Sequence, residues 1–213
     1  MAPTRPTQLV LFDLDGVLLN SKDNMRAAWA VVQRELGVTV PFERYFENIG
    51  IPFADIMAVL GLQNLATEAN RIYFAASRQL ESLLAWYPCV DELLLNLSRA
   101  GHKLGVVTSK DGNRARELLE QLPVTFDTIQ TPIKGLRGKP APDHLLMACA
   151  LTNTDPSETV FVGDMPVDLE AAQRAGVRFW HAAWGYGKAP NSGCEIIAHP
   201  LDLLPHTVVG LAA

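Results

Sequence analysis

Two aspartates stand two residues apart directly after a short apolar run. Asp13 and Asp15 follow residues 9–12, all of which are apolar, and the period of two in an extended chain directs both side chains to one side. Two carboxylates this close repel each other, and keeping both ionised in a crevice is costly without a cation. A solvated turn capped by Asp15 would explain that residue, but not Asp13 immediately behind a buried run. The pair therefore indicates a cation site.

A second acidic pair follows another apolar run. Asp164 comes after residues 159–162 and Gly163, and Asp168 lies four residues further on. Because the carboxyl ends of parallel strands lie on one side of a sheet, the two acidic pairs can converge there. Carboxylate oxygens suit Mg²⁺, which keeps water and substrate phosphate among its ligands. Asp168 also fits the first turn of a helix, where an acid offsets the helix dipole, and this alternative stays open.

Two further segments carry groups that could hold a phosphate. Thr108 and Ser109 end the apolar run 104–107 just before an expected helix, and hydroxyls with free N–H groups at such a junction bind anions. This signal is weak alone, because Thr and Ser cap helices everywhere. Lys139 precedes Pro140 in a proline-flanked segment that would restrict the backbone and aim the ammonium group. A lone lysine is usually a surface charge, so this one gains weight only from the other three segments.

These residues need a scaffold of strands and helices that alternate along the chain. Short apolar runs, typical of buried parallel strands, occur at residues 9–12, 104–107, 159–162 and 177–180, with a weaker candidate at 126–130. Apolar stripes at helical spacing lie between them, at residues 90–100, 114–122, 143–151 and 166–175. The alternation predicts an α/β fold with a doubly wound, Rossmann-like parallel sheet and right-handed crossovers.

One stretch breaks this alternation. Residues 21–84 show no convincing strand, and their helical patterns lie at 24–36, 52–61 and 67–84. We therefore expect an all-α cap domain at residues 21–84, inserted after the first strand, and a core domain formed by residues 1–20 and 85–213. A single extended helical crossover is the alternative.

Composition and charge exclude several classes of protein. The 213 residues include 18 Lys and Arg against 23 Asp and Glu, a net charge of −5, which argues against a nucleic-acid binder with a broad basic face. The longest early apolar stretch, residues 9–19, is interrupted by two aspartates and is too short to cross a bilayer. No apolar signal core follows the first eight residues. We therefore expect a cytoplasmic protein with neither nucleic acid nor membrane as a partner.

Cysteines and histidines add no candidate site. The three cysteines are far apart and form no CxxC pair, so neither a disulfide framework nor a zinc cluster is expected. The five histidines show no ligand spacing and are expected on surfaces or at loop ends: His102, His144, His181, His199 and His206.

Taken in order, these elements resemble the haloacid dehalogenase superfamily, in particular its phosphoglycolate phosphatase-like and beta-phosphoglucomutase-like subgroup with a helical cap. The resemblance covers nearly the whole chain. It rests on four segments: Phe12-Asp13-Leu14-Asp15-Gly16-Val17, Val107-Thr108-Ser109-Lys110, Gly138-Lys139-Pro140-Ala141-Pro142-Asp143, and Val162-Gly163-Asp164 with Asp168. Each segment alone is a weak signal, but four in this order at expected strand ends are highly specific.

The resemblance implies roles for individual residues in the hydrolysis of a phosphomonoester. Asp13 would be the nucleophile that forms an aspartyl-phosphate, and Asp15 would be the general acid and then the general base. Thr108 would hydrogen-bond the phosphoryl group with help from the backbone of Ser109. Lys139 would neutralise charge on the phosphate and on Asp13, since a carboxylate that attacks a phosphate dianion faces mutual repulsion.

The resemblance also implies Mg²⁺ as the cofactor. Its ligands would be the carboxylate of Asp13, the backbone carbonyl of Asp15 and the carboxylate of Asp164. Asp168 would act in a supporting or water-mediated role.

Other activities of the superfamily fit the residues less well. Its dehalogenases need no metal and lack the second aspartate, whereas Asp15 is present here. The beta-phosphoglucomutase-like mutases are the closer alternative, but they carry a histidine in the first cap helix that Met25 replaces. A phosphonate hydrolase would need a Schiff-base lysine from the cap, where Lys22 is the only lysine. A non-catalytic phosphate- or partner-binding member of the fold would have no need for Asp15.

The expected substrate is a small phosphorylated metabolite, of the phosphoglycolate or sugar-phosphate type. Residues 48–53 are the candidate cap segment facing the active site, and their lack of charge favours a small, weakly polar leaving group. A hinge turn leading into a helix would explain the same residues. The sequence leaves the oligomeric state open between a monomer and a homodimer.

Overall fold

The apolar residues 9–12 form strand β1 (Leu9–Phe12) near the middle of a six-stranded parallel sheet in a computed structural model that describes residues 7–207. The strand order is β5-β4-β1-β6-β7-β8, which is the order of a doubly wound, Rossmann-like sheet. The other strands are β4 (Lys103–Val107), β5 (Thr128–Gln130), β6 (Thr159–Gly163), β7 (Arg178–Ala182) and β8 (Glu195–Ile197). The predicted fold class is confirmed.

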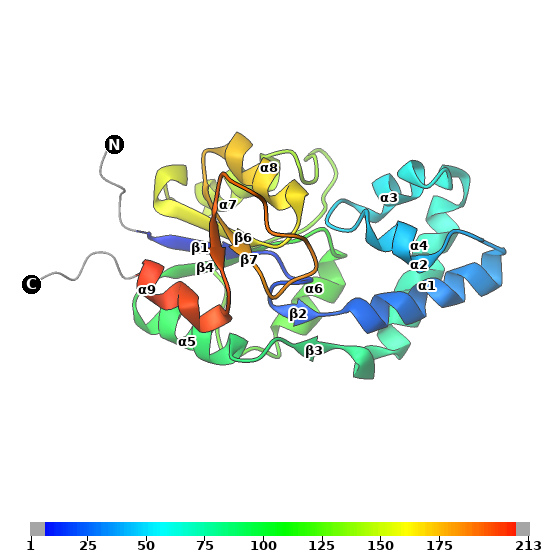
Figure 1. Cartoon of the computed structure of the whole chain (residues 1–213), viewed down its shortest axis with the longest axis horizontal. Coiled ribbons are helices and arrows are strands. Elements are labelled where there is room, and N and C mark those ends of the chain that lie inside the picture. The colour runs from blue at the N-terminus through cyan, green and yellow to red at the C-terminus, as the bar shows by residue number, and fades with distance from the viewer. Residues whose placement is uncertain (1–6, 208–213) are drawn as a thin grey trace, which may run out of the picture.

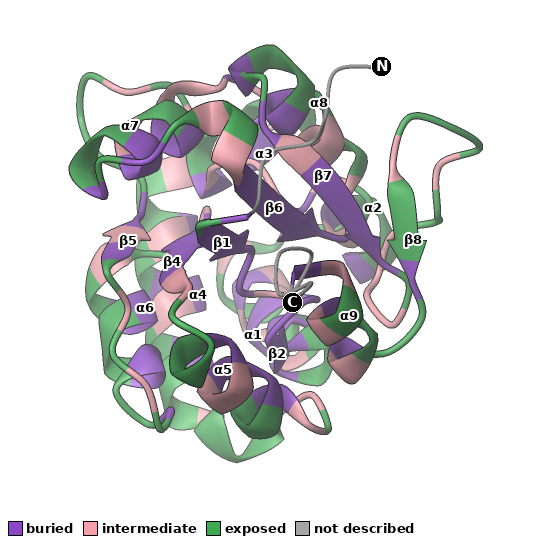
Figure 2. Cartoon of the chain, turned by 90° about the vertical axis from the view of Figure 1, so that its left-hand side faces the viewer, coloured by how far each residue is buried: buried purple, intermediate pink, exposed green. Residues whose placement is uncertain are grey.

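Successive residues of β1 face opposite layers of the core, as the pleat of a strand requires. Val10 and Phe12 pack towards one layer, and Leu9 and Leu11 pack towards the other. The first layer contains α5 (Val90–Arg99), α6 (Gly112–Leu119) and α9 (Leu203–Thr207). The second contains α7 (Asp143–Leu151) and α8 (Pro166–Ala175). Figure 2 shows the buried strands between these helices, which is why the strands are apolar on both faces.

Residues 22–83, which lie between the first two core strands, form a lobe of helices only (Figure 1). Its apolar side chains pack mainly against one another, in a cluster rich in aromatic rings where Trp29 stacks on Tyr45 at 4.5 Å between ring centroids. The helices are α1 (Lys22–Leu36), α2 (Phe42–Phe46), α3 (Phe53–Val59) and α4 (Ala66–Gln79), with 3₁₀ turns at Gln63–Leu65 and Glu81–Leu83.

The chain passes between the two lobes along a short antiparallel ribbon. Strand β2 (Leu19–Asn20) leads into the helical lobe and pairs with β3 (Ala85–Trp86), which leads back to the core. The ribbon therefore brings the entry and exit of the helical lobe side by side, at the carboxyl-end side of β1.

Several short elements differ from the sequence-based expectation. The last helix of the helical lobe ends at Gln79 rather than near residue 84 because the chain turns there through a 3₁₀ segment towards β3. The pattern also missed α2, β8 and the ribbon, all of them too short to show a period. The expectation that the histidines lie on surfaces or at loop ends is wrong for His144 and His181, which are buried in α7 and β7.

No helix within residues 7–207 is both long enough and apolar enough to cross a membrane.

Candidate active site

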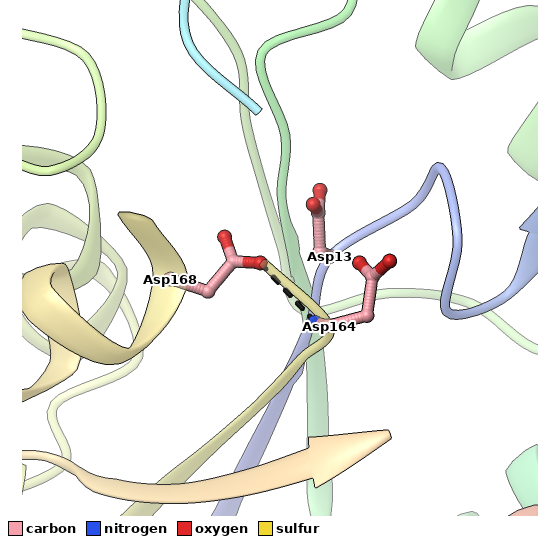
Figure 3. Close-up of side chains that lie close together, drawn as sticks. All are labelled: Asp13, Asp164 and Asp168. Atoms are coloured by element: carbon pink, nitrogen blue, oxygen red, sulfur yellow. Dashed lines mark hydrogen bonds between the residues drawn. The ribbon is translucent and has the colours of Figure 1, made fainter. Parts of the chain in front are cut away.

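Three carboxylates meet at the carboxyl ends of β1 and β6. The two strands are parallel neighbours, and the backbone N–H of Asp13 donates to the carbonyl of Val162 at 2.9 Å. This pairing places Asp13 beside the loop that carries Asp164 and Asp168. Each of the three offers a carboxylate oxygen, and these oxygens lie within 4.8 Å of one another (Figure 3). Among the described residues, this is the one group of three or more acidic, His or Cys side chains placed to hold a metal ion.

Burial makes two of these carboxylates, those of Asp13 and Asp164, reluctant to ionise. Burial raises the pKa of Asp13 to about 7, although the nearby ammonium of Lys139 acts against the shift. Burial, together with the charges of Asp168 and Asp13, also raises the pKa of Asp164 well above its usual range. Buried acids of this kind are stable as anions only beside cations.

Lys139 supplies one of the cations. Its Nζ lies 2.9 Å from Oδ2 of Asp13 and donates to Oδ1 of Asp168 at 2.7 Å. Burial alone would lower the pKa of this lysine, but the two carboxylates raise it above its ordinary value. Lys139 is therefore charged, and it cannot balance three carboxylates alone.

The remaining charge and the free lone pairs fit a divalent cation. Oδ1 of Asp164 is buried without a hydrogen-bond partner, which is costly unless a cation or another donor reaches it. Oxygen ligands around a buried negative site are those that Mg²⁺ and similar hard ions take. The residues present therefore fit such an ion.

Asp168 serves the backbone as well as the charge cluster. Its Oδ2 accepts from the N–H groups of Asp164 at 3.2 Å and Met165 at 2.9 Å, at the start of α8. Its Oδ1 is bound to Lys139. Asp168 therefore binds backbone N–H groups at the first turn of α8, as the alternative in the sequence analysis held, and it also belongs to the carboxylate cluster.

Glycines allow the backbone to approach Asp164 closely. Gly16 has φ +90°, and a Cβ there would collide with the Asp164 carboxylate. A Cβ on Gly185 would meet the same side chain. Gly16 and Gly185, which are far apart in the sequence, both pack against the side chain of Asp164. A larger residue at either position would displace that side chain.

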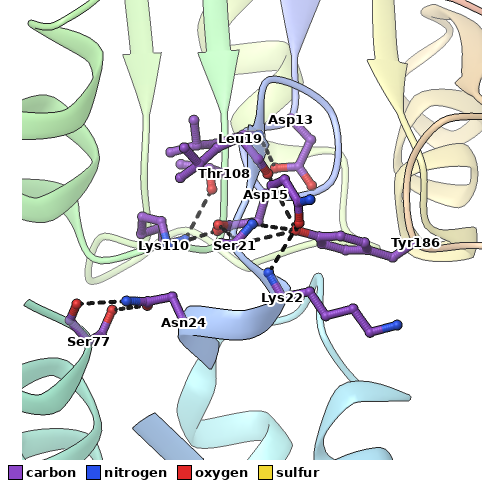
Figure 4. Close-up of polar contacts among 12 residues, drawn as sticks. Asp13, Asp15, Leu19, Ser21, Lys22, Asn24, Ser77, Thr108, Lys110 and Tyr186 are labelled. Atoms are coloured by element: carbon purple, nitrogen blue, oxygen red, sulfur yellow. Dashed lines mark hydrogen bonds and ion pairs between the residues drawn. The ribbon is translucent and has the colours of Figure 1, made fainter. Parts of the chain in front are cut away.

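Asp15 is held by a different set of groups (Figure 4). The hydroxyl of Ser21 donates to its Oδ1 at 2.6 Å, and Nζ of Lys110 lies 3.0 Å from its Oδ2. The lysine reaches Asp15 from the loop after β4, and the serine stands just before α1. The neighbouring carboxylates Asp13 and Asp15 therefore have separate cations.

Tyr186 joins the two halves of the site. Its backbone N–H donates to Oδ2 of Asp164 at 2.7 Å, and its hydroxyl oxygen accepts the backbone N–H of Ser21 at 2.6 Å. The centroid of its ring lies 5.2 Å from the ring centroid of Phe46 in the helical lobe. Tyr186 thus contacts the carboxylate cluster, the serine that binds Asp15, and the helical lobe.

The predicted phosphate-binding residues lie at the same edge of the sheet. Thr108 is buried, and its hydroxyl oxygen accepts the backbone N–H of Lys110 at 3.2 Å. Ser109 donates its hydroxyl to the carbonyl of Gly50 in the helical lobe at 2.6 Å, so its side chain joins the two lobes.

A cavity of about 60 Å³ lies between the lobes and opens on these groups. Asp13, Asp15, Thr108, Ser109 and Lys110 line its core side, with Met165. The helical lobe lines the other side with Met25, Tyr45, Ile49, Gly50, Ile51, Phe53, Ile56, Tyr73 and Phe74. The expectation that residues 48–53 face the site is met by Ile49, Gly50, Ile51 and Phe53, whereas Asn48 and Pro52 do not line the cavity.

Sequence reasoning missed three residues of the site. Lys110 lies in one of the four segments that carry the family resemblance, but nothing in the sequence indicated its ion pair with Asp15. Ser21 and Tyr186 are 165 residues apart, and nothing in the local pattern connects them. A tyrosine in a glycine-flanked loop after a strand was the available signal.

The ordered segments and their meeting point match a known family. The match to haloacid dehalogenase-like hydrolases extends over residues 10–182 and includes all four segments. The chain belongs to the haloacid dehalogenase-like hydrolase family. Family membership accounts for the shared edge of the sheet at which the four segments meet.

Relatives of this haloacid dehalogenase-like hydrolase include named phosphatases. It is 29% identical to the phosphoglycolate phosphatase of Aquifex aeolicus over 205 residues, 92% of this chain and 95% of that protein. It is 33% identical to the validoxylamine A 7′-phosphate phosphatase of Streptomyces hygroscopicus subsp. limoneus over 177 residues, 80% and 83% of the two chains. A solved hydrolase structure from Pseudomonas syringae gives a TM-score of 0.81 at 25% identity, covering 95% of this chain and 97% of that one. The predicted enzyme class, a phosphoric monoester hydrolase, is confirmed at that level.

Proposed function

We propose that this hydrolase is a Mg²⁺-dependent phosphatase that releases phosphate from a small phosphomonoester through a covalent intermediate on Asp13. One observation carries the proposal. Asp13, beside two more carboxylates and Lys139, faces the same cavity as Asp15, which has a separate cation, Lys110, and a separate donor, Ser21. A nucleophile and a proton donor need this separation of environments.

Asp13 acts first, as the nucleophile. A carboxylate oxygen forms a bond to phosphorus while the bond between phosphorus and the ester oxygen breaks. Asp15 gives its proton to that oxygen, so the leaving group departs as a neutral alcohol. Lys139, 2.9 Å from Asp13, offsets the repulsion between the carboxylate and the phosphoryl group.

Asp15 then acts as the base. It takes a proton from a water molecule while the water oxygen attacks phosphorus and the bond to Asp13 breaks. The products are inorganic phosphate, the free carboxylate of Asp13 and a protonated Asp15, which restores the starting state. Splitting one displacement into two gives each step its own aligned nucleophile.

The ligands proposed for Mg²⁺ are Asp13, Asp164 and the backbone carbonyl of Asp15, with Asp168 in support. When bound, the ion supplies positive charge to the phosphoryl oxygens. Asp168 is already engaged by Lys139 and two backbone N–H groups, which favours a supporting role. Thr108 and the backbone of Ser109 are proposed to bind the phosphoryl group.

We assign residues 21–84 as a cap and residues 1–20 and 85–213 as the core. The separate apolar cluster of the helical lobe and the ribbon at its base support this division. In this arrangement the cap covers the cavity and limits the access of water to the intermediate.

The residues of the cavity support a mutase, a phosphonate hydrolase or a phosphate-binding protein less well than a phosphatase. Met25 of α1 lines it, and a thioether cannot move the proton that a histidine in that helix would move in a mutase. Lys22 lies with its Nζ 4.7 Å from the centroid of the Phe46 ring and does not line the cavity, which disfavours a Schiff-base role. Asp15 with its own hydrogen bonds has no evident use in a protein that only binds phosphate.

Asp13→Asn tests the proposal directly. The variant keeps the shape of the side chain, so we expect a folded protein whose kcat for a phosphomonoester falls by at least about 1,000-fold. Phosphate release from p-nitrophenyl phosphate with Mg²⁺ measures the loss, and a chelator should stop the wild-type reaction.

The exposed Asp91→Asn on α5 is the matched control and should keep wild-type activity. Wild-type turnover by Asp13→Asn would remove this residue as the nucleophile. A wild-type protein inactive on a broad panel of phosphomonoesters would refute the phosphatase proposal. Glucose 1-phosphate, assayed for isomerisation and for phosphate release, separates a mutase from a phosphatase.

A further inference from the structure

We infer that the leaving group of the substrate is a small, uncharged alcohol with an apolar body, because the cap wall of the cavity offers apolar contact and no free charge. The inference rests on the proposed phosphatase function and narrows it to one substrate class. It excludes leaving groups that carry a carboxylate, such as glycolate, and leaving groups that carry a second phosphate.

The two walls of the cavity differ sharply in chemistry. The core wall carries the polar groups that face phosphorus: Asp13, Asp15, Thr108, Ser109 and Lys110. The cap wall, where the leaving group must lie, consists of apolar and aromatic side chains with two tyrosines: Met25, Tyr45, Ile49, Ile51, Phe53, Ile56, Tyr73 and Phe74, with Gly50. Each methylene that enters such a wall favours binding.

No cation lining the cavity is free to receive an anionic leaving group, within the part of the chain that the structure describes. Lys110 is the one cation in the lining, and its Nζ is 3.0 Å from Asp15. Lys139 is bound between Asp13 and Asp168. A carboxylate placed against the cap would therefore be buried without a partner, which is strongly unfavourable.

The two cations in the first half of α1 are engaged elsewhere. Lys22 lies over the ring of Phe46, and Arg26 forms a 2.7 Å ion pair with Glu43. Neither residue lines the cavity. The cap thus contains positive charge near α1 without presenting it to the substrate.

The polar side-chain atoms of the cap wall are the hydroxyls of Tyr45 and Tyr73. Both residues are buried, and their ring centroids are 5.5 Å apart. Burial raises the pKa of both hydroxyls above the usual value, so they stay neutral. They can satisfy one neutral polar atom of a leaving group, but they supply no charge.

The size of the cavity limits the leaving group further. The cavity volume of about 60 Å³ is several times the roughly 10–15 Å³ that one water molecule needs on the same measure. A leaving group of a few carbon atoms therefore matches the cavity, and a larger one requires the cap to move.

A pair of substrates of equal size tests the inference. Isobutyl phosphate and phosphoglycolate have the same number of non-hydrogen atoms beyond the bridging oxygen, but only the second carries a carboxylate. We expect kcat/KM for isobutyl phosphate to exceed that for phosphoglycolate by at least about tenfold, measured as phosphate release with Mg²⁺. An equal or higher value for phosphoglycolate would overturn the inference while leaving the phosphatase function intact. Release from neither ester, nor from a wider phosphomonoester panel, would instead refute the function.

A cation placed in the cap wall should reverse the preference. Phe74 is half-buried and lines the cavity, so Phe74→Arg brings a guanidinium to the leaving group, and Phe74→Leu is the apolar control. We expect Phe74→Arg to shift the ratio of the two kcat/KM values at least about tenfold towards phosphoglycolate, while Phe74→Leu keeps the wild-type preference. Ile51→Arg, also at a half-buried lining position, repeats the test if Phe74→Arg does not fold. An unchanged ratio in a folded arginine variant would contradict the inference.

Discussion

Two neighbouring aspartates of the same loop have unlike surroundings. Asp13 is buried beside Lys139 and two further carboxylates, and burial raises its pKa to about 7. Asp15 instead takes a hydrogen bond from Ser21 and an ion pair from Lys110. Different partners allow chemically identical side chains to do different work. For Asp13 to act as the proposed nucleophile it must be ionised, which the cation proposed beside it would favour.

The contact between Ser21 and Tyr186 yields a prediction at the residue scale. Tyr186→Phe removes the hydroxyl that accepts the N–H of Ser21, and Ser21→Ala removes the hydroxyl that holds Asp15. Each change loosens Asp15, so we expect kcat to fall about tenfold with little change in KM. Steady-state kinetics on one phosphomonoester measures both parameters.

The double variant is the decisive control. If both residues act through Asp15, the double variant loses no more than about the larger single loss. Losses that multiply would show that the Tyr186 hydroxyl acts elsewhere, for instance through its contact with the carbonyl of Leu19.

At the scale of elements, a tight turn before α3 forms one of the contacts between the cap and the core. The carbonyl of Gly50 accepts the hydroxyl of Ser109, and Val167 at the start of α8 packs against the same glycine. A Cβ on Gly138 would lie 2.6 Å from Cγ of Pro52, which shows how closely the turn approaches the loop of Lys139. The turn thus fixes the cap wall relative to the phosphate-binding end of the sheet.

Gly50→Ala tests the importance of this turn. Gly50 has φ +98°, and a Cβ there would lie 2.8 Å from Cγ2 of Val167, so alanine must move the turn away from the core. We expect kcat/KM to fall about tenfold because the cap no longer closes on the site, together with a loss of about 1–2 kcal/mol in the free energy of unfolding. Kinetics and urea unfolding measure the two effects.

Gly37→Ala is the matched control. Gly37 ends α1 with φ +65°, but a Cβ there meets nothing within 4 Å. This variant should lose similar stability and keep its kcat/KM. A similar loss of activity in both variants would show that strain, and not the contact with the core, affects catalysis.

At the scale of the whole molecule, the buried carboxylates couple stability to pH and to cations. The pKa of Asp13 is about 7 in the folded protein, and that of Asp164 is also raised, against a usual value near 3.8. Between those values the folded state binds more protons than the unfolded state. Without a divalent cation, this part of the stability therefore falls as pH rises from about 4 to 7.

Magnesium should stabilise the protein more at pH 8 than at pH 5.5. Protons compete with the ion for the carboxylates at low pH. With Mg²⁺ at about 100 times its dissociation constant, the gain is about 2.7 kcal/mol, which corresponds to a rise in Tm of about 5–10 °C for a chain of this size. Thermal unfolding at both pH values, with NaCl at equal ionic strength as the control, measures the difference. Equal shifts at the two pH values, or a shift that persists in Asp164→Asn, would contradict the assignment of these ligands.

Much of the molecule was predictable from local patterns. The apolar runs before Asp13 and Asp164 are strands because continuous apolar residues suit a sheet covered on both faces. Since parallel strands end on the same side, both aspartates had to reach one edge of the sheet. Helices such as α7 and α8 began and ended at the predicted residues because their apolar stripes and flanking proline or glycine residues are local signals.

The partners of each side chain depended on tertiary packing. The pairing of Asp15 with Lys110, the bridge made by Tyr186 and the double engagement of Asp168 join segments that lie far apart along the chain. The short ribbon and β8 exist only because neighbouring segments supply their hydrogen bonds.

The amino-acid sequence by itself thus determined the family, the sheet and the edge at which the acidic residues gather, because these follow from local periodicity and the direction of parallel strands. Only the folded chain decided which cation serves which carboxylate and how apolar the cap wall is. Those properties arise from distances between side chains on different elements, and such distances are set by packing.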